Sequence, residues 1–279
     1  MNVAVTGGTG FIGRHVVAEL ERRGVSPTIV CRPNSSAPAA FARHTIVRMD
    51  LSAPPPDAFD VMHQPDTLIH LAWGGLPQYG SSHHVQTELP AQYAFLKQLV
   101  EEGLGNCLVT GTCFEYGDAS GALSESLATC PKNPYGVAKD SLRRQLEALQ
   151  RQAPFNLTWA RLFYLYGDGQ AAGSLLPELR RAVERGDRDF GLSPGDQIRD
   201  YLPVETAAAH LVSLAMSGRN NGVVNVCSGS PVSVRQLVEG WVEQYGWSIS
   251  LRFGERPYSS YEPMAFWGDA SKLHHVLAD

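Results

Sequence analysis

The glycine-rich segment near the N-terminus constrains the fold more than any other feature of this chain. Gly7, Gly10 and Gly13 follow the spacing Gly-x-x-Gly-x-x-Gly, directly after the apolar run 2–6 and at the start of a helical pattern. Gly7 permits a tight turn, Gly10 lets the backbone approach a pyrophosphate, and Gly13 lets the helix pack close to the strand. The helix N-terminus then presents free N–H groups and a positive dipole end to the phosphates. We therefore expect a dinucleotide-binding loop rather than a turn alone, with contacts from Gly7, Thr9, Gly10, Phe11, Ile12 and Gly13.

Short β-branched runs alternate with longer helical patterns along the chain. Strands are expected at 2–6, 27–31, 45–49, 67–71, 106–110, 156–160 and 222–227, with helices after the glycine loop, at 91–102 and at 134–152. Strands separated by helices imply right-handed crossovers and a parallel sheet covered by helices on both faces. The pattern predicts a doubly wound, seven-stranded parallel α/β sheet. Glycine-rich polar stretches at 167–173 and 186–195 break the alternation, so the chain is expected to leave the sheet there.

The end of the second strand indicates which dinucleotide the loop binds. A site for NAD usually carries an acidic residue there for the ribose hydroxyls, but this chain has Cys31 followed by Arg32. No carboxylate repels a 2′-phosphate and a guanidinium is available to bind one, so NADP(H) is favoured. NAD(H) stays possible if Arg32 is merely solvated. Further cofactor contacts are expected at the ends of the next two strands, from Asp50, Leu51, Leu71, Ala72 and Trp73.

A tyrosine and a lysine four residues apart open the helix expected at 134–152. Tyr135 and Lys139 share one helical face. A tyrosine with a pKa of about 10 is a poor acid–base at neutral pH. A neighbouring ammonium and an oxidised nicotinamide both favour the phenolate and lower that pKa. The pair is common on surface helices, but beside a dinucleotide loop it indicates proton transfer to a carbonyl or from an alcohol.

Together these segments resemble the short-chain dehydrogenase/reductase superfamily. The similarity is to its extended branch, the NAD(P)-dependent epimerase/dehydratase family of nucleotide-sugar enzymes. It implies a Rossmann-type fold with a small discontinuous C-terminal lid: residues 1–163 plus about 200–228 would bind the dinucleotide, and about 164–199 plus 229–279 the substrate. The matching motifs are TGGTGFIG at 6–13, DL at 50–51, HLA at 70–72, TGTCFEYG at 110–117, NPYGVAK at 133–139, RLFYLYG at 161–167, RDYLPV at 199–204 and NVCSG at 225–229.

The resemblance also implies roles for single residues. Thr112 would hydrogen-bond the substrate oxygen alongside Tyr135, unless it only caps the strand end, and Lys139 would hold the nicotinamide ribose. Arg199 would bind the substrate diphosphate, unless it forms a structural ion pair with Asp200 or another carboxylate. Tyr164 stands where the family has a substrate-binding Asn. Other substrate contacts are expected from the two residues after Thr112, which are Cys113 and Phe114.

Those two residues separate the reactions that the family performs. Its sugar 4,6-dehydratases have acidic residues at both positions, and Phe114 cannot transfer a proton, so that chemistry is disfavoured. If the segment after Thr112 is extended, Glu115 would point to the opposite side from Phe114. The favoured function is reduction, by NADPH, of the C4 keto group of a nucleoside-diphospho-4-keto-6-deoxyhexose. The first alternative is a 4-epimerase with tightly bound NAD. The second alternative is an NADP-sensing protein without catalytic activity.

Composition limits the partners and the setting of the chain. Its 279 residues carry a formal charge of −5, a poor basis for binding nucleic acid, and are too apolar for a disordered chain. No apolar run approaches the ~18 residues of a membrane span, and no secretory signal opens the chain, so a cytoplasmic protein is expected. The five cysteines and nine histidines lack metal-ligand spacing, so no metal is expected. The family's habit suggests a homodimer through 91–102 and 134–152, although their apolar residues could equally pack on the sheet: Tyr93, Leu96, Leu142, Leu146 and Leu149.

Overall fold

A seven-stranded parallel sheet forms the centre of the molecule. The computed structural model describes residues 1–35, 39–258 and 263–278. The strand order is β11-β7-β5-β4-β1-β2-β3, and every pairing in this sheet is parallel. The predicted fold class is therefore confirmed. The strands are β1 (Val3–Thr6), β2 (Thr28–Cys31), β3 (Thr45–Arg48), β4 (Thr67–His70), β5 (Asn106–Thr112), β7 (Asn156–Leu162) and β11 (Gly222–Val226).

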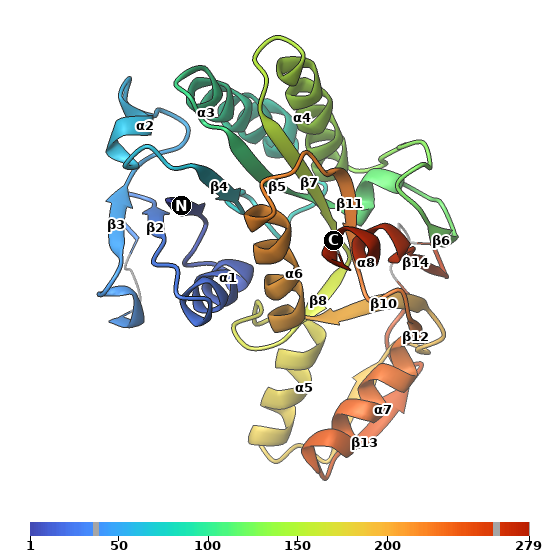
Figure 1. Ribbon diagram of the computed structural model, residues 1–279. Helices are drawn as coiled ribbons and strands as arrows, with labels where there is room; N and C mark the ends of the chain where they lie inside the picture. Colours follow the sequence, from blue (N-terminus) through green and yellow to red (C-terminus); the bar gives the residue numbers. More distant parts are fainter. Residues whose placement is uncertain (36–38, 259–262, 279) are drawn as a thin grey trace.

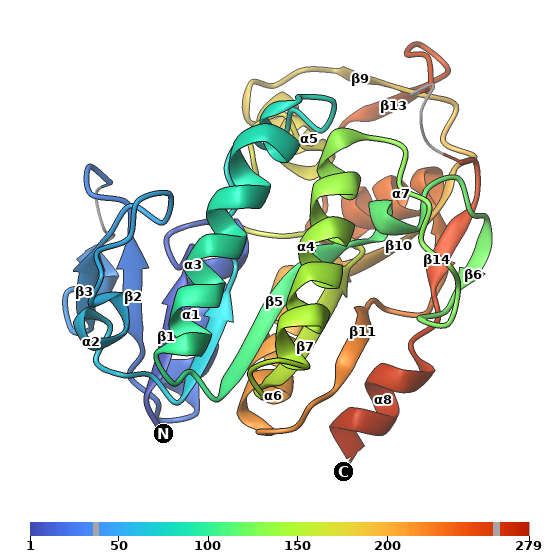
Figure 2. The same ribbon diagram turned by 90° about the horizontal axis from the view of Figure 1, so that it is seen from above.

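Helices cover both faces of this sheet (Figures 1 and 2). One face packs against α1 (Phe11–Arg22), α6 (Val204–Met216) and α8 (Ser271–Ala278). The other packs against α2 (Ala58–Val61), α3 (Leu89–Glu101) and α4 (Pro134–Gln150). Each face has its own cluster of buried apolar side chains, many of them Val and Leu, as expected for a sheet buried on both sides.

The apolar residues considered for a dimer interface serve this packing instead. Leu96, Leu142, Leu146 and Leu149 are buried in the cluster between the sheet and helices α3 and α4, and Tyr93 packs against it. They are therefore not outer-face residues, because the amphipathic face of each helix turns toward the sheet. The homodimer stays a prediction without these contacts.

A smaller set of elements lies beyond one end of the sheet (Figure 1). Helices α5 (Leu175–Glu184) and α7 (Val234–Tyr245) enclose an apolar cluster with β9 (Asp189–Leu192) and β13 (Ser250–Phe253). The chain leaves the main sheet after β7 and returns at β11, and both glycine-rich stretches, 167–173 and 186–195, lie outside that sheet as predicted. The remaining elements are β6 (Gly121–Leu123), β8 (Tyr164–Tyr166), β10 (Ile198–Pro203), β12 (Pro231–Ser233) and β14 (Phe266–Gly268), with helical turns at Ala39–Phe41, His84–Glu88 and Cys113–Tyr116.

The predicted division into two domains stays a prediction, and residues 259–262 and 279 of its second part lie outside the described residues. All five cysteines are free, with Cys130 exposed and the others buried. No helix in the described part of the chain is long and apolar enough to span a bilayer.

Candidate active site

The glycine loop connects β1 to the start of α1 and packs against the residues that follow the neighbouring strand β4. Gly7 has a φ of +71°, and a Cβ there would lie 2.8 Å from the Ala72 nitrogen after β4. The Gly10 N–H donates to the Gly7 carbonyl at 2.9 Å. A Cβ on Gly13 would lie 2.1 Å from the Gly7 oxygen, so only glycine lets α1 pack this close. Gly10 is exposed, and Thr9, Phe11 and Ile12 are half-buried around the open first turn of the helix.

The other expected cofactor residues follow the carboxyl ends of β2, β3 and β4, which lie at one edge of the sheet. Arg32 is exposed, whereas Cys31 is buried. Asp50 is exposed and accepts the backbone and hydroxyl hydrogens of Ser52, at 2.9 and 2.7 Å, which lowers the pKa of its carboxyl. The residues that are half-buried along this edge are Leu51, Leu71, Ala72 and Trp73.

The three expected catalytic residues come together where β5 meets α4. Thr112 is the last residue of β5, and its hydroxyl lies close enough to the phenol of Tyr135 to influence the pKa of that phenol. Asn133 caps α4 by accepting the Gly136 N–H at 2.8 Å, and Pro134 follows at the helix start. This cap fixes the first turn, which carries Tyr135, and Lys139 follows one turn later on the same face.

Burial changes the proton affinity of both α4 residues. Tyr135 and Lys139 are both buried, with 9% and 2% of the residue surface exposed. Burial raises the pKa of Tyr135, and the hydrogen bond from Thr112 opposes that rise. Burial also lowers the pKa of Lys139 to about 7, while its ammonium donates to the Thr110 carbonyl at 2.9 Å. Each group therefore tends toward its uncharged form near neutral pH.

An aromatic enclosure surrounds Tyr135. Ring centroids of Tyr79, His84, Trp73 and Phe114 lie 5.5, 5.3, 6.0 and 6.4 Å from its ring. The Trp73 indole also covers Lys139, with the ammonium 3.9 Å from the ring centroid. Tyr79 and His84 belong to the segment that connects β4 to α3. In the structure the rings of Tyr79 and His84 contact the ring of Tyr135. Nothing in the positions of these residues along the sequence predicts this contact.

The segment after Thr112 is not extended, so the condition under which Glu115 was expected to point away from Phe114 is not met. Residues Cys113–Tyr116 form a single 3₁₀ turn in which Thr112 and Glu115 make a reciprocal cap. The turn points Glu115 into the protein, where it is fully buried beside Arg161. Cys113 is buried as well, and Phe114 faces the aromatic enclosure.

Arg199 and Tyr164 lie at the boundary with the smaller set of elements. Arg199 is 2% exposed, and its Nη1 donates to the carbonyls of Ile198 and Met264 at 2.9 and 3.2 Å. Its guanidinium lies over the rings of Phe266 and Tyr164, at 4.6 and 5.9 Å. Asp200 accepts the backbone N–H groups of Ser228, Gly229 and Gly268. The Asp200 carboxylate thus connects the loop after β11 to the end of β14.

Two hollows flank α5. One, of about 250 Å³, has Arg180 and Arg181 in its wall, and the other, of about 240 Å³, has Arg181, Arg185 and Arg256. Arg180 pairs with Asp168 at 2.8 Å and Arg256 with Glu178 at 3.0 Å. The first hollow lies beside α1, because Gly169 in its wall approaches Arg14 of that helix.

A family model described as the NAD dependent epimerase/dehydratase family matches residues 3–227. The chain belongs to this family. It is accordingly an enzyme fold of the extended short-chain dehydrogenase/reductase type, and the resemblance expected from the sequence is confirmed.

Relatives within the epimerase/dehydratase family cover nearly the whole chain. A dTDP-6-deoxy-L-talose 4-dehydrogenase (NAD(+)) of Aggregatibacter actinomycetemcomitans is 29% identical over 96% of this chain and 99% of its own. A UDP-glucose 4-epimerase of Halalkalibacterium halodurans is 25% identical over 99% of this chain and 90% of its own. Among solved structures, MoeE5 in complex with UDP-glucuronic acid and NAD is 28% identical, with a TM-score of 0.83 over 100% of this chain and 93% of the other.

Proposed function

We propose that this enzyme reduces the C4 keto group of a nucleoside-diphospho-4-keto-6-deoxyhexose with NADPH. The observation that carries the proposal is the meeting of Thr112, Tyr135 and Lys139 beside the glycine loop. The next two residues are Cys113 and Phe114 instead of an acidic pair, and Phe114 cannot transfer the proton that eliminating water requires. The relative named as a 6-deoxytalose 4-dehydrogenase supports it, because 4-dehydrogenation and 4-ketoreduction are one reaction in opposite directions.

The residues of the glycine loop fit a dinucleotide. The turn at Gly7 and the contact of Gly13 with it leave no room for side chains, and the first turn of α1 keeps N–H groups without intrahelical acceptors. Those amides suit the pyrophosphate. Bound NADPH would supply the hydride that reduces C4. Arg32, exposed at the end of β2, supports the 2′-phosphate form, whereas the names of the relatives mention NAD.

The protein's own groups handle the proton. Tyr135 stays protonated in its buried position and donates to the oxygen that becomes an alkoxide at C4. The Thr112 hydroxyl hydrogen-bonds the same oxygen and so stabilises its developing charge. Lys139 orients the nicotinamide ribose, and its positive charge, when present, stabilises the phenolate that Tyr135 leaves behind.

The diphosphate of the substrate requires positive charge near the sugar. In the proposal this role belongs to Arg199, which two backbone carbonyls and two aromatic rings hold in one orientation. Tyr164, packed under the same guanidinium, would contact the substrate beside it. The arginine-lined hollows at α5 could then receive the nucleotide end of the molecule.

The reaction can be tested directly. Purified protein is incubated with NADPH and a set of nucleoside-diphospho-4-keto-6-deoxyhexoses while the absorbance of reduced nicotinamide is followed. We expect absorbance to fall with the wild type and not with Tyr135→Phe, because the phenylalanine variant keeps the ring but cannot donate a proton. The reductase proposal is wrong if absorbance never falls and an ordinary UDP-sugar is instead converted to its 4-epimer.

That second outcome would identify the 4-epimerase, which uses the same three catalytic residues and is represented among the relatives. An epimerase keeps its cofactor and returns the hydride, so denatured protein would release bound NAD. A protein that binds NADPH but converts neither kind of sugar nucleotide would be an NADP-sensing protein. The presence of both Tyr135 and Lys139 argues against that last function.

A further inference from the structure

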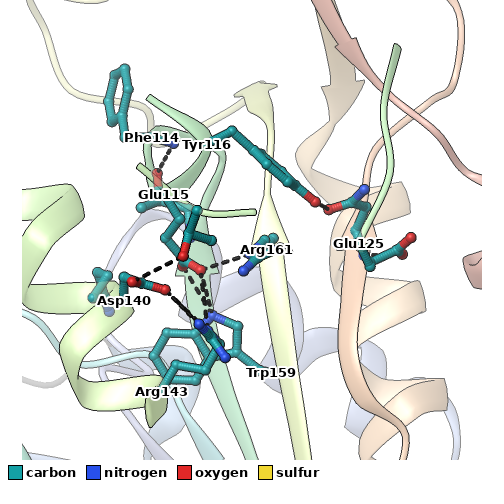
Figure 3. A network of polar contacts seen from close by, with 12 residues as sticks. Phe114, Glu115, Tyr116, Glu125, Asp140, Arg143, Trp159 and Arg161 are labelled. Carbon is teal, nitrogen blue, oxygen red and sulfur yellow. Dashed lines mark hydrogen bonds and ion pairs between the residues drawn. The ribbon is translucent and has the colours of Figure 1, made fainter. Parts of the chain in front are cut away.

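Glu115 is a fully buried carboxylate for which the proposed mechanism has no use. Three donors converge on it (Figure 3). The backbone N–H of Thr112 donates to Oε1 at 2.9 Å, Nε1 of Trp159 donates to the same oxygen at 2.9 Å, and Nε of Arg161 donates to Oε2 at 2.7 Å. One of its three partners is thus a catalytic residue, and the other two belong to the neighbouring strand β7.

The contact with Thr112 determines where the catalytic hydroxyl lies. Thr112 is extended, at the point where β5 gives way to the 3₁₀ turn, and its Oγ1 accepts the Phe114 N–H at 3.3 Å. The carboxylate holds the peptide group on one side of Thr112, and the turn holds its hydroxyl on the other. With both held, the hydroxyl stays near the phenol of Tyr135, where it opposes the rise that burial causes in the pKa of that phenol. Without the carboxylate, the Thr112 peptide could rotate away from this position.

The surroundings make Glu115 a rigid support. A Cβ on Gly111 would lie 2.2 Å from Nε1 of Trp159 and 2.4 Å from Oε1 of Glu115. Only glycine at this position leaves room for the carboxylate and the indole. Nε of Arg143 lies 4.0 Å from Oε2, and Arg143 is held on α4 by Asp140 at 2.7 Å and by Glu147 at 2.6 Å. The cluster therefore links the strand that carries Thr112 to the helix that carries Tyr135.

Stability alone explains this cluster poorly. Burial raises the pKa of Glu115, and Arg161 opposes that rise. Burying both charges is costly, and well-packed apolar residues of similar volume often serve stability equally well. A fixed carboxylate is more useful where it orders a reacting group, since preorganised donors act without reorganising during the reaction.

We propose that Glu115 is a positioning residue, which holds the Thr112 hydroxyl against Tyr135 through the Thr112 peptide N–H. This inference rests on the proposed function only in that Thr112 and Tyr135 act on the sugar oxygen, and it holds equally for reduction and for epimerisation. The test therefore uses whichever of the two reactions the wild type catalyses, so that failure of the reductase proposal is seen separately.

A double-mutant cycle tests the pathway through Thr112. Glu115→Gln should lower kcat about 100-fold, the loss expected for misplacing a reacting group by about 1 Å. The KM and the affinity for NADPH should stay within about twofold, because the loop that binds the cofactor is untouched. In the Thr112→Val background, where no hydroxyl remains to be positioned, Glu115→Gln should cost almost nothing more in kcat. Equal losses in both backgrounds, or a wild-type kcat for Glu115→Gln, would overturn the proposal.

Tyr116→Phe is the matched control. It removes the phenol's hydrogen bond to Asn225, of 2.8 Å, in the same turn and keeps the ring over which the Arg161 guanidinium lies at 4.6 Å. It should lower the melting temperature and keep kcat. If Glu115→Gln does not fold, Trp159→Phe removes one donor with a smaller change and should show the same dependence on Thr112, with a smaller loss.

Amide hydrogen exchange gives a readout that needs no turnover. The Thr112 N–H should be protected in the wild type and in Tyr116→Phe, and should exchange faster in Glu115→Gln or, less so, in Trp159→Phe. Unchanged protection of this amide in the Glu115 variant would also contradict the proposal.

Discussion

Replacing Lys139 with methionine should change how the stability of this protein depends on pH. The Lys139 side chain is buried, with its ammonium 2.9 Å from the Thr110 carbonyl and 3.9 Å from the centroid of a Trp73 ring. Burial lowers the pKa of this lysine from 10.5 to about 7, and the more distant Glu115 and Glu88 oppose the shift. Methionine has a similar length and no proton to exchange.

The sign follows from which state binds the proton. Between pH 7 and 10.5 the unfolded chain carries a proton on Lys139 that the folded protein has lost. The free energy of unfolding must therefore rise with pH, by about 1.4 kcal/mol per pH unit from this group. Across the whole window the gain is about 5 kcal/mol. Below pH 7 both states are protonated and above 10.5 both are neutral, so the contribution is constant outside the window.

The measurement is denaturant unfolding of wild type and Lys139→Met from pH 7 to 9.5. The advantage of the methionine variant should be largest at pH 7 and shrink steadily as pH rises. Other groups cancel in the difference: burial raises the pKa of Cys107 to about 12, for example, but equally in both proteins. Lys97→Met, which changes a half-exposed lysine on α3, should leave the slope unaltered. Parallel curves for wild type and Lys139→Met would refute the reasoning.

Three further substitutions test the cofactor site and the strand end. Arg32→Ala should raise the KM for NADPH about 10- to 100-fold, the worth of a guanidinium–phosphate contact, and leave the KM for NADH unchanged; equal effects on both cofactors would exclude a 2′-phosphate contact. Gly13→Ala, whose Cβ would lie 2.1 Å from the Gly7 oxygen, should abolish NADPH binding in calorimetry, and normal affinity would show that the loop can yield. Gly111→Ala should lower the free energy of unfolding by about 1–3 kcal/mol through its clash with Trp159 and Glu115, and an unchanged denaturation midpoint would contradict that packing.

Local patterns in the sequence were sufficient to predict the sheet and the proximity of Tyr135 to Lys139. The seven strands and the glycine loop depend on residue types within a few positions of one another. Tyr135 and Lys139 meet because they are one helical turn apart, and Asn133 and Pro134 mark where that helix begins. The ends of β5 and β7 were predicted two residues short, since Thr112 and Leu162 lie in stretches whose pairing comes from the neighbouring strand.

The orientation of Glu115 shows what a local pattern contains and what it lacks. Thr112 and Glu115 stand in the order Ser/Thr-x-x-Glu, the signature of a capping box, which predicts a helical turn rather than a continued strand. That signal was available in the sequence. The destination of the carboxylate was not, because Trp159 and Arg161 lie on another strand, 44 and 46 residues further along. The contacts of Tyr79 and His84 with Tyr135 likewise depend on tertiary packing.

The two buried charges of the site should respond to neutralisation in opposite ways. The contacts of the Lys139 ammonium are a carbonyl and an indole face, so removing the charge relieves the cost of its burial. Glu115 is paired with the equally buried Arg161, so neutralising it leaves a guanidinium uncompensated, at a cost of about 3–5 kcal/mol. Both substitutions should lower activity. If Lys139→Met gains stability while Glu115→Gln loses it, the lysine is retained at a cost to the fold because it acts on the reactants, whereas the glutamate is part of the framework that orders Thr112.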